Sequence, residues 1–305
     1  MATFSYADFK AVELADRAVL EPFLSVSSER SCEFCFVNLY AWGPSCGTHW
    51  QEYNGKLWFH LRDSDELLVA GEPTLQDVQE VSGELRKQGF IGRFGQIREE
   101  TLAAMPGVQA GFEVRTMEEA RWEYIYDVEE LAQMRGVQFS ALRHHVAQFR
   151  REFPHYRTQP LEPALLPACQ ELARQWRPAD PDREMLSEGE ALELCLDAFT
   201  PLGADGLALF SGDALLGFSV VAPLAGEMFD EPFEKARHDC RGAAQMLLLE
   251  TVKYLSGRCR LLNREQDLGL PGLRRAKHAC GPQALLKNCW LIPLARDSGR
   301  DTKMP

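Results

Sequence analysis

The sequence has no apolar run that approaches the ~20 residues a helix needs to cross a bilayer. Its N-terminal segment also lacks the basic and apolar stretches of a secretory signal peptide. Positive charge is in deficit, because the formal net charge is -12, and this argues against a protein that coats nucleic acid with its whole surface. We therefore expect a cytoplasmic protein with no stable membrane insertion.

Cysteine motifs are sparse as well. The nine cysteines form an odd, scattered set that suits a reducing compartment better than a disulfide framework. Cys32 and Cys35 have the spacing of half a metal or redox motif, but no second pair stands at a partner spacing. We expect buried thiols there and predict no metal site.

What the chain does contain is enough apolar sequence for a sizeable core. Its 305 residues and 45% apolar content favour two domains over one. We place a first domain at residues 1–125, a second at 126–294 and a flexible tail at 295–305. Both halves show the same predicted order, which indicates a structural duplication: a leading helix, a hairpin, a long amphipathic helix, a strand, a short helix and a strand.

Local signals support this order of elements. Asn54-Gly55 between alternating residues predicts a hairpin, and Thr74 with Asp77 predicts the capped start of a helix that Gly89 ends. Residues 34–42 are too aromatic for a surface loop and are predicted to lie in the core. The predicted elements of the second half include helices over 140–153, 165–176 and 241–257, a helix that Ser187 and Glu190 cap and that reaches Phe199, a hairpin over 207–221 and a last strand over 284–294.

The predicted helix over residues 140–153 has an apolar stripe and a basic face. Arg143 and Arg150 lie seven residues apart on that face, with His144 and Arg151 beside them. Such a face is most often simply solvated. The alternative is that residues of this helix contact the phosphates of a tRNA or a lipid head group.

The densest chemistry lies in residues 263–277, between an apolar strand and a short helix. Charges of both signs and two glycines follow the carboxyl end of the strand, where open α/β sheets bind ligands. Glu265 and Asp267 are the candidate catalytic carboxylates. The candidate substrate-binding residues of this stretch are Asn263, Arg264, Gly269, Gly272, Arg274 and Lys277.

A second interpretation of the same stretch is a network of ion pairs that only holds the turn. Residues elsewhere complete the candidate binding set. Glu234 and Lys235 approach from an adjacent strand, and Gly242 with Ala243 opens a helix whose free N–H groups suit an anion. Arg143 of the basic helix is the last member.

Hairpin strands followed by a glycine-led helix, a strand, a short helix and a closing strand resemble the core of the GNAT acyltransferases. In that family, the pyrophosphate of coenzyme A lies on the N-terminus of the glycine-led helix. The family signature there is Gln or Arg, two residues, Gly, one residue, then Gly or Ala. In this chain the first position of that signature is the acidic Asp239.

A more extensive resemblance is to the DUF2156 family, named for its similarity to the C-terminal catalytic domain of bacterial phosphatidylglycerol lysyltransferases. The matching pieces are residues 34–42, 124–126, 131, 135–136, 143–149, 233–236, 242–243 and 263–277, followed by Pro282. Cys280 and His144 stand where the family usually has Tyr and Asn. The resemblance implies an α+β fold of two tandem GNAT-like (acyl-CoA N-acyltransferase-like) domains, each a mixed sheet flanked by helices.

The resemblance also implies an activity, because the lysyltransferases move an amino acid from aminoacyl-tRNA onto a lipid. The leading hypothesis is a transferase that delivers an acyl or aminoacyl group, from acyl-CoA or aminoacyl-tRNA, to an amine or hydroxyl of a small molecule or lipid head group. Such chemistry needs a base for the proton of the nucleophile and donors for a tetrahedral oxyanion. The competing hypothesis is a non-catalytic protein that binds a ligand, a lipid head group or tRNA on the same fold.

Overall fold

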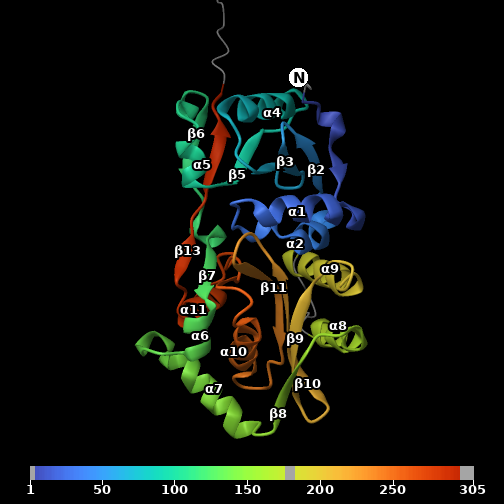
Figure 1. The fold of residues 1–305 in the computed structure, drawn as a ribbon, viewed down its shortest axis with the longest axis vertical. Helices are drawn as coiled ribbons and strands as arrows, with labels where there is room; N and C mark the ends of the chain where they lie inside the picture. The colour runs from blue at the N-terminus through green and yellow to red at the C-terminus, as the bar shows by residue number, and fades with distance from the viewer. Residues whose placement is uncertain (1–3, 176–182, 296–305) are drawn as a thin grey trace, which may run out of the picture.

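The computed structural model describes residues 4–175 and 183–295, which form two seven-stranded sheets flanked by helices (Figure 1). The expected helix end at residues 176–181 and the expected tail at 296–305 lie outside the described residues. Within the described part, no helix is both long enough and apolar enough to span a membrane.

The first sheet has the strand order β1-β2-β3-β4-β5-β14-β6. Strands β4 and β5 are parallel, and helix α4 connects them. The predicted hairpin forms β2 and β3 around Asn54-Gly55, and Thr74 and Asp77 form the predicted capping box of α4. The bounds are β1 (Lys10–Ala11), β2 (Thr48–Tyr53), β3 (Lys56–Leu61), β4 (Glu66–Ala70), β5 (Arg93–Ile97), β6 (Phe112–Thr116), β14 (Cys289–Pro293), α1 (Arg17–Val26), α2 (Phe36–Ala41), α3 (Gly43–Cys46), α4 (Leu75–Lys87) and α5 (Glu99–Ala103).

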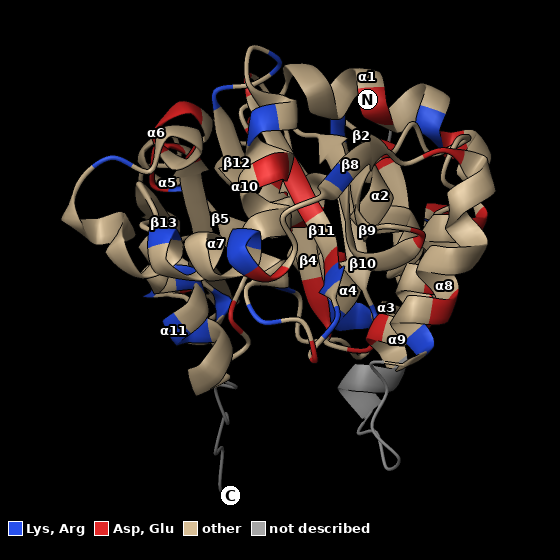
Figure 2. Cartoon of the chain, turned by 90° about the horizontal axis from the view of Figure 1, so that it is seen from below, with Lys and Arg blue, Asp and Glu red and all other residues tan. Residues whose placement is uncertain are grey.

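The second sheet has the order β13-β7-β12-β11-β10-β9-β8. Helix α10 connects its parallel strands β11 and β12, and Figure 2 shows acidic residues along β11. The bounds are β7 (Glu123–Asp127), β8 (Tyr156–Pro160), β9 (Asp205–Ser211), β10 (Ala214–Pro223), β11 (Met228–Ala236), β12 (Leu261–Asn263), β13 (Ala284–Leu286), α6 (Val128–Gln133), α7 (Ser140–Glu152), α8 (Leu166–Gln175), α9 (Arg183–Asp197), α10 (Ala243–Leu255) and α11 (Pro271–Ala279).

The parallel strands β11 and β12 diverge within the second sheet. They pair only where Met228 to Asp230 lies beside Leu261 to Asn263. Strand β11 then continues beside β10, whereas β12 ends. The loop that follows Asn263 therefore starts at the point of divergence, which is where the candidate residues of the sequence begin.

The two halves exchange strands. Residues 284–294, predicted as one strand of the second domain, form β13 beside β7 and then β14 between β5 and β6 of the first sheet. Strand β7 already belongs to the second sheet, although it begins before the predicted boundary at residues 125 and 126. Sequence pattern identifies strands but not their partners, because pairing depends on contacts between distant parts of the chain.

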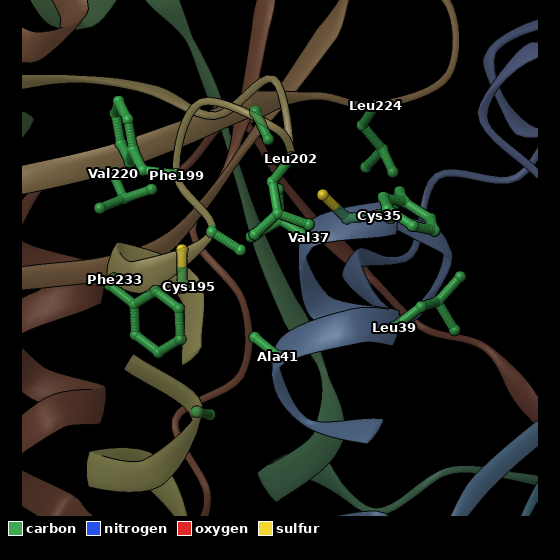
Figure 3. Packing of buried hydrophobic residues seen from close by; sticks show 14 of the residues in the cluster. Cys35, Val37, Leu39, Ala41, Cys195, Phe199, Leu202, Val220, Leu224 and Phe233 are labelled. Carbon is green, nitrogen blue, oxygen red and sulfur yellow. The ribbon is translucent and has the colours of Figure 1, made fainter. Parts of the chain in front are cut away.

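Helices α1 and α2 lie between the two sheets (Figure 1). Figure 3 shows Val37 and Ala41 of α2 in one packed cluster with Cys195 of α9 and Phe233 of β11. Residues 34–42 are therefore core, as predicted. Cys32 and Cys35, at and just before the start of this block, are buried free thiols, also as predicted. Because this core is shared, side chains of the first half reach the second sheet.

Helix α7 packs directly on the start of α10. Gly242 precedes α10 with a left-handed φ of 79°, and a Cβ placed there would lie 2.5 Å from the carbonyl oxygen of His145 and 3.1 Å from Cβ of Phe149. Only glycine fits this backbone and this contact. The glycine that the sequence assigns to anion binding is thus also needed for helix packing.

We predict that Gly242→Ala destabilises the protein by about 2–4 kcal/mol, through backbone strain and the contact with α7. Gly257→Ala is the matched control. It has a similar φ of 75° but no atom within 4 Å of an added Cβ, so only about 1–2 kcal/mol of strain is expected. Urea denaturation measures both, and equal losses would contradict the packing argument.

Candidate functional site

The chain turns sharply after Asn263, and Glu265 has a left-handed φ of 57°. Such a backbone costs of order 1–3 kcal/mol for a residue with a side chain and persists only where its surroundings hold it. Asn263 Oδ1 accepts the N–H of Glu265 at 2.8 Å. The buried Lys277 of α11 donates from Nζ to the carbonyl oxygens of Arg264, at 2.6 Å, and of Gln266. The carbonyl oxygen of Glu265 itself accepts from the N–H of Tyr124 at 3.2 Å, so the peptide groups on both sides of Glu265 are fixed.

The carboxylate of Glu265 has few partners of its own. Its Oε1 accepts from Nδ2 of Asn38 at 2.8 Å. Burial raises the pKa of Glu265 to about 7, against the opposing effects of the Lys277 charge and the Asn38 hydrogen bond. A carboxyl that titrates near neutral pH is well matched to proton transfer.

This raised pKa predicts that Glu265→Gln stabilises the protein at pH 8 more than at pH 5. The folded pKa lies near 7 against an ordinary 4.5. The stability that the protonated carboxyl supplies is therefore present below about pH 4.5 and lost as pH rises through 7. Glutamine keeps the shape and the acceptor but takes no charge. We expect the melting temperature to rise by roughly 3–8 °C at pH 8 and by less than half of that at pH 5.

The exposed Glu227→Gln is the control for this titration, and it should show no such difference. An equal change in the melting temperature of Glu265→Gln at both pH values would contradict a Glu265 carboxyl that titrates near neutral pH.

Arg264 connects the end of β12 to the neighbouring strand β11. Its guanidinium donates to Glu231 and, at 2.6 Å, to Glu234 of β11. Ser219 of β10 holds the other oxygen of Glu231 at 2.7 Å. Burial raises the pKa of Glu234 to about 7, although Arg264 opposes the shift. The next residue, Lys235, donates to Glu188 of α9 at 2.6 Å.

Asp267 is fully buried and lies at the centre of a separate set of contacts. It accepts from the hydroxyl of Tyr124 at 2.7 Å, from Nε and Nη2 of Arg274 at 2.7 and 3.0 Å, and from the N–H of Gly269 at 2.8 Å. Burial alone would raise the pKa of Asp267, but these donors lower it to about 2. A carboxylate so fully engaged is a weak proton acceptor. The contacts favour an anchoring role over the catalytic role that the sequence predicts.

Three polar residues absent from the sequence predictions lie at this site. Asn38 of α2 donates to Asp230 of β11 at 2.9 Å as well as to Glu265. Glu123 of β7 accepts from Nδ2 of Asn263 at 2.5 Å. A polar residue inside predicted core was the available signal for Asn38, whereas Asp230 and Glu123 lie in segments that were not predicted as core.

Glu123 also reaches the first half of the chain. It accepts from the hydroxyl of Ser31 at 2.5 Å and from the N–H of Cys32 at 2.9 Å. Because Asn263 binds the same carboxyl, one buried residue joins the segment before α2 to the end of β12.

The remaining candidates lie apart from Glu265. Arg143 donates to the carbonyl oxygens of Met134 and Gly136 at 2.5 and 2.7 Å, and these hydrogen bonds fix the loop between α6 and α7 to helix α7. Ala243 is buried at the start of α10, whereas Gly272 is exposed on α11. The described residues contain no group of three His, Cys, Asp or Glu side chains placed to hold a metal ion.

The comparisons with known proteins concern the whole chain. The family model of the phosphatidylglycerol lysyltransferase C-terminal region matches residues 25–288. A conserved protein of unknown function from Bacteroides thetaiotaomicron VPI-5482 has a TM-score of 0.86 at 26% identity, over 94% of this chain and 99% of that one. No curated protein matches.

Two further solved structures have a similar fold. The C-terminal domain (DUF2156) of a protein described as a lysylphosphatidylglycerol synthetase from Agrobacterium fabrum has a TM-score of 0.63 at 12% identity, over 93% of both chains. A GNAT family acetyltransferase from Colwellia psychrerythraea has a TM-score of 0.52 at 12% identity, over 94% of this chain and 99% of that one. The fold is therefore the tandem GNAT-like α+β fold that the sequence predicts.

Proposed function

The chain belongs to the family of the phosphatidylglycerol lysyltransferase C-terminal domain, and we propose that it is an acyl- or aminoacyltransferase with Glu265 as its general base. The observation that carries the proposal is the Glu265 carboxyl. It lies where two parallel strands diverge, on a turn fixed from both sides, and its pKa is about 7. A base with such a pKa is half ionised near neutral pH, which is favourable for proton transfer.

In the proposed reaction, an amine or hydroxyl of the acceptor attacks the carbonyl carbon of the acyl donor. Glu265 takes the proton of the nucleophile as the new bond forms. The tetrahedral intermediate then collapses, the bond to the donor breaks, and the leaving oxygen or sulfur takes up a proton. Asn263 and Lys277 hold the turn that aims Glu265, while Asp267 with Arg274 anchors the loop that follows.

We further propose that the donor is an aminoacyl-tRNA rather than acyl-coenzyme A. The start of α10, which matches the pyrophosphate-binding helix of GNAT enzymes in chain order, is covered by α7 at Gly242. Asp239 stands before it and is engaged by Arg237 at 2.6 Å. An acidic residue beside a closed helix start is unfavourable for a pyrophosphate.

The test uses purified protein with radiolabelled lysyl-tRNA or alanyl-tRNA and vesicles that contain phosphatidylglycerol, and counts label in the lipid extract. A parallel reaction offers labelled acetyl-coenzyme A and polyamines. Label in lipid that depends on both tRNA and phosphatidylglycerol is the expected result. Transfer from acetyl-coenzyme A alone would overturn the choice of donor. Tight tRNA binding with no transfer from any donor would favour the non-catalytic alternative.

The basic face of α7 is the proposed tRNA contact. Because Arg143 is committed to backbone carbonyls, the exposed Arg150 and Arg151 are the side chains available for phosphates. We predict that replacing both with alanine weakens tRNA binding. The negative slope of log K against log salt should become shallower by about 1–2. Arg115→Ala, a half-exposed arginine of β6, is the control. An unchanged slope would exclude this face.

A further inference from the structure

The proposed base and the amide that holds it come from different halves of the chain. Glu265 follows β12 of the second sheet, whereas Asn38 lies on α2, between the two sheets. Asn38 is 7% exposed, and its Nδ2 donates to Glu265 Oε1 at 2.8 Å, to Asp230 Oδ2 at 2.9 Å and to the carbonyl oxygen of Cys32 at 3.1 Å. One amide nitrogen therefore lies between carboxyl groups from two diverging strands.

We propose that Asn38 is a positioning residue of the transfer site, which holds Glu265 and Asp230 as a carboxyl pair through one shared donor. The inference rests on the proposed function, because that function makes Glu265 the base. The first half of the chain then supplies part of the site, because the second half alone would lack the amide that holds Glu265 in place.

The physical argument starts from two neighbouring acids. Both cannot ionise cheaply in a buried place, since like charges repel and a carboxylate out of water is costly. Asp230 is completely buried, and burial and the nearby Glu265 raise its pKa well above the ordinary value. Burial and the neighbouring carboxyl therefore both favour the protonated form of Asp230.

Two buried oxygens without a hydrogen-bond partner among the described residues are consistent with a protonated Asp230. Asn38 Oδ1 and Asp230 Oδ1 are buried, and neither has a hydrogen-bond partner in the described part of the chain. Unsatisfied buried acceptors are uncommon and costly. A proton on Asp230 removes its charge, and a neutral oxygen without a partner is less costly to bury than a charged one.

The ionisation of Glu265 depends on every charged group that faces it. The groups around it are Lys277 of α11, Glu123 of β7, Asp230 of β11, Glu188 of α9, and Cys32, Glu33 and Cys35 before α2. Only Asn38 donates to its carboxylate among the hydrogen bonds of the described residues. Removal of this donor should therefore make the charged form of Glu265 harder to reach, without a change in net charge.

The test needs no substrate. In protein labelled with ¹³C at glutamate carboxyls, the Glu265 signal is assigned by its loss in Glu265→Gln and titrated by NMR. Asn38→Leu removes the donor at similar volume, and we expect the pKa of Glu265 to rise by about one unit, which lowers the ionised fraction at pH 7 about fivefold. Asn38→Asp keeps the shape but adds an acid, and should raise that pKa at least as far.

Asn288→Leu is the matched control, because Asn288 is a buried amide just before β14 that donates to Gln96 of β5 at 2.8 Å. It should leave the titration of Glu265 unchanged. An unshifted Glu265 in both Asn38 variants, or an equal shift in the control, would overturn the inference. If Asn38→Leu does not fold, Asn38→Asp decides alone.

The transfer assay gives a second readout for the same variants. Asn38→Leu should lower kcat about fivefold at pH 7 and recover toward wild type at pH 9, with KM unchanged. A purely structural role would not produce this dependence on pH. Absence of transfer in the wild type would overturn the proposed function and leave the NMR result to decide the role of Asn38.

Discussion

Glu265→Gln should lower the rate of group transfer by about 10²–10⁴-fold, the range that a positioned general base contributes. Glutamine preserves the side-chain shape and the acceptor for Asn38 but cannot take a proton from the nucleophile. The measurement is single-turnover transfer of label from aminoacyl-tRNA at pH 7.5. The exposed Glu130→Gln should keep the wild-type rate.

Asp267→Asn distinguishes the role of Asp267 from that of Glu265, the two carboxylates predicted as catalytic from the sequence. Asp267 binds Arg274 and Tyr124 and already has a pKa of about 2. Its loss should loosen the loop and weaken activity at every pH, with no change in the shape of the pH profile. Full activity in Glu265→Gln, together with a lost pH dependence in Asp267→Asn, would reverse the assignment.

Glu123→Ala should lower the free energy of unfolding by about 3–5 kcal/mol, because three buried donors lose a hydrogen bond and only the amide of Asn263 keeps another acceptor, the carbonyl oxygen of Arg30 at 3.1 Å. Those donors are the hydroxyl of Ser31, the N–H of Cys32 and the amide of Asn263. The change would disconnect the segment before α2 from the end of β12. Urea denaturation followed by fluorescence provides the measurement.

The exposed Glu227→Ala serves as the control for that unfolding experiment and should change stability by less than about 0.5 kcal/mol. A loss below about 1 kcal/mol in Glu123→Ala would show that water or other groups replace its hydrogen bonds. The buried carboxyl would then not be what joins the two halves.

Much of the fold could be predicted because its signals are local. The Asn54-Gly55 turn and the capping box at Thr74 act within a few residues, and both form as expected. The exchange of β14 into the first sheet could not be predicted in this way. It depends on pairing with β5 and β6, whose sequences carry no mark of that partner.

The same limit applies to the site. Residues 263–277 were identifiable because their charges follow a strand end and precede a helix. Asn38 was not assigned to the site, because the only signal was its polarity within an aromatic block that sequence analysis assigns to the core. Its neighbour Glu265 is 227 positions away, and only packing of α2 against the second sheet brings the two together.

The first sheet offers an instructive comparison. Its parallel strand β5 contains Gln96, which has a positive φ of 56° like that of Glu265. Its side chain accepts from Asn288 at 2.8 Å. A neutral amide therefore has this backbone conformation in β5, whereas a carboxyl has it after β12. The parallel strands of the first sheet also hold a buried carboxylate, Glu66 of β4, which binds Arg121 at 3.1 Å.

The most direct test of the account is the pH dependence of transfer from labelled aminoacyl-tRNA to phosphatidylglycerol vesicles, measured for the wild type and for Glu265→Gln between pH 5.5 and about 8.5. The account predicts a wild-type rate that rises as pH passes through about 7, where Glu265 ionises, and a low, flat rate in the variant. A variant that transfers at the wild-type rate with the same profile would contradict it.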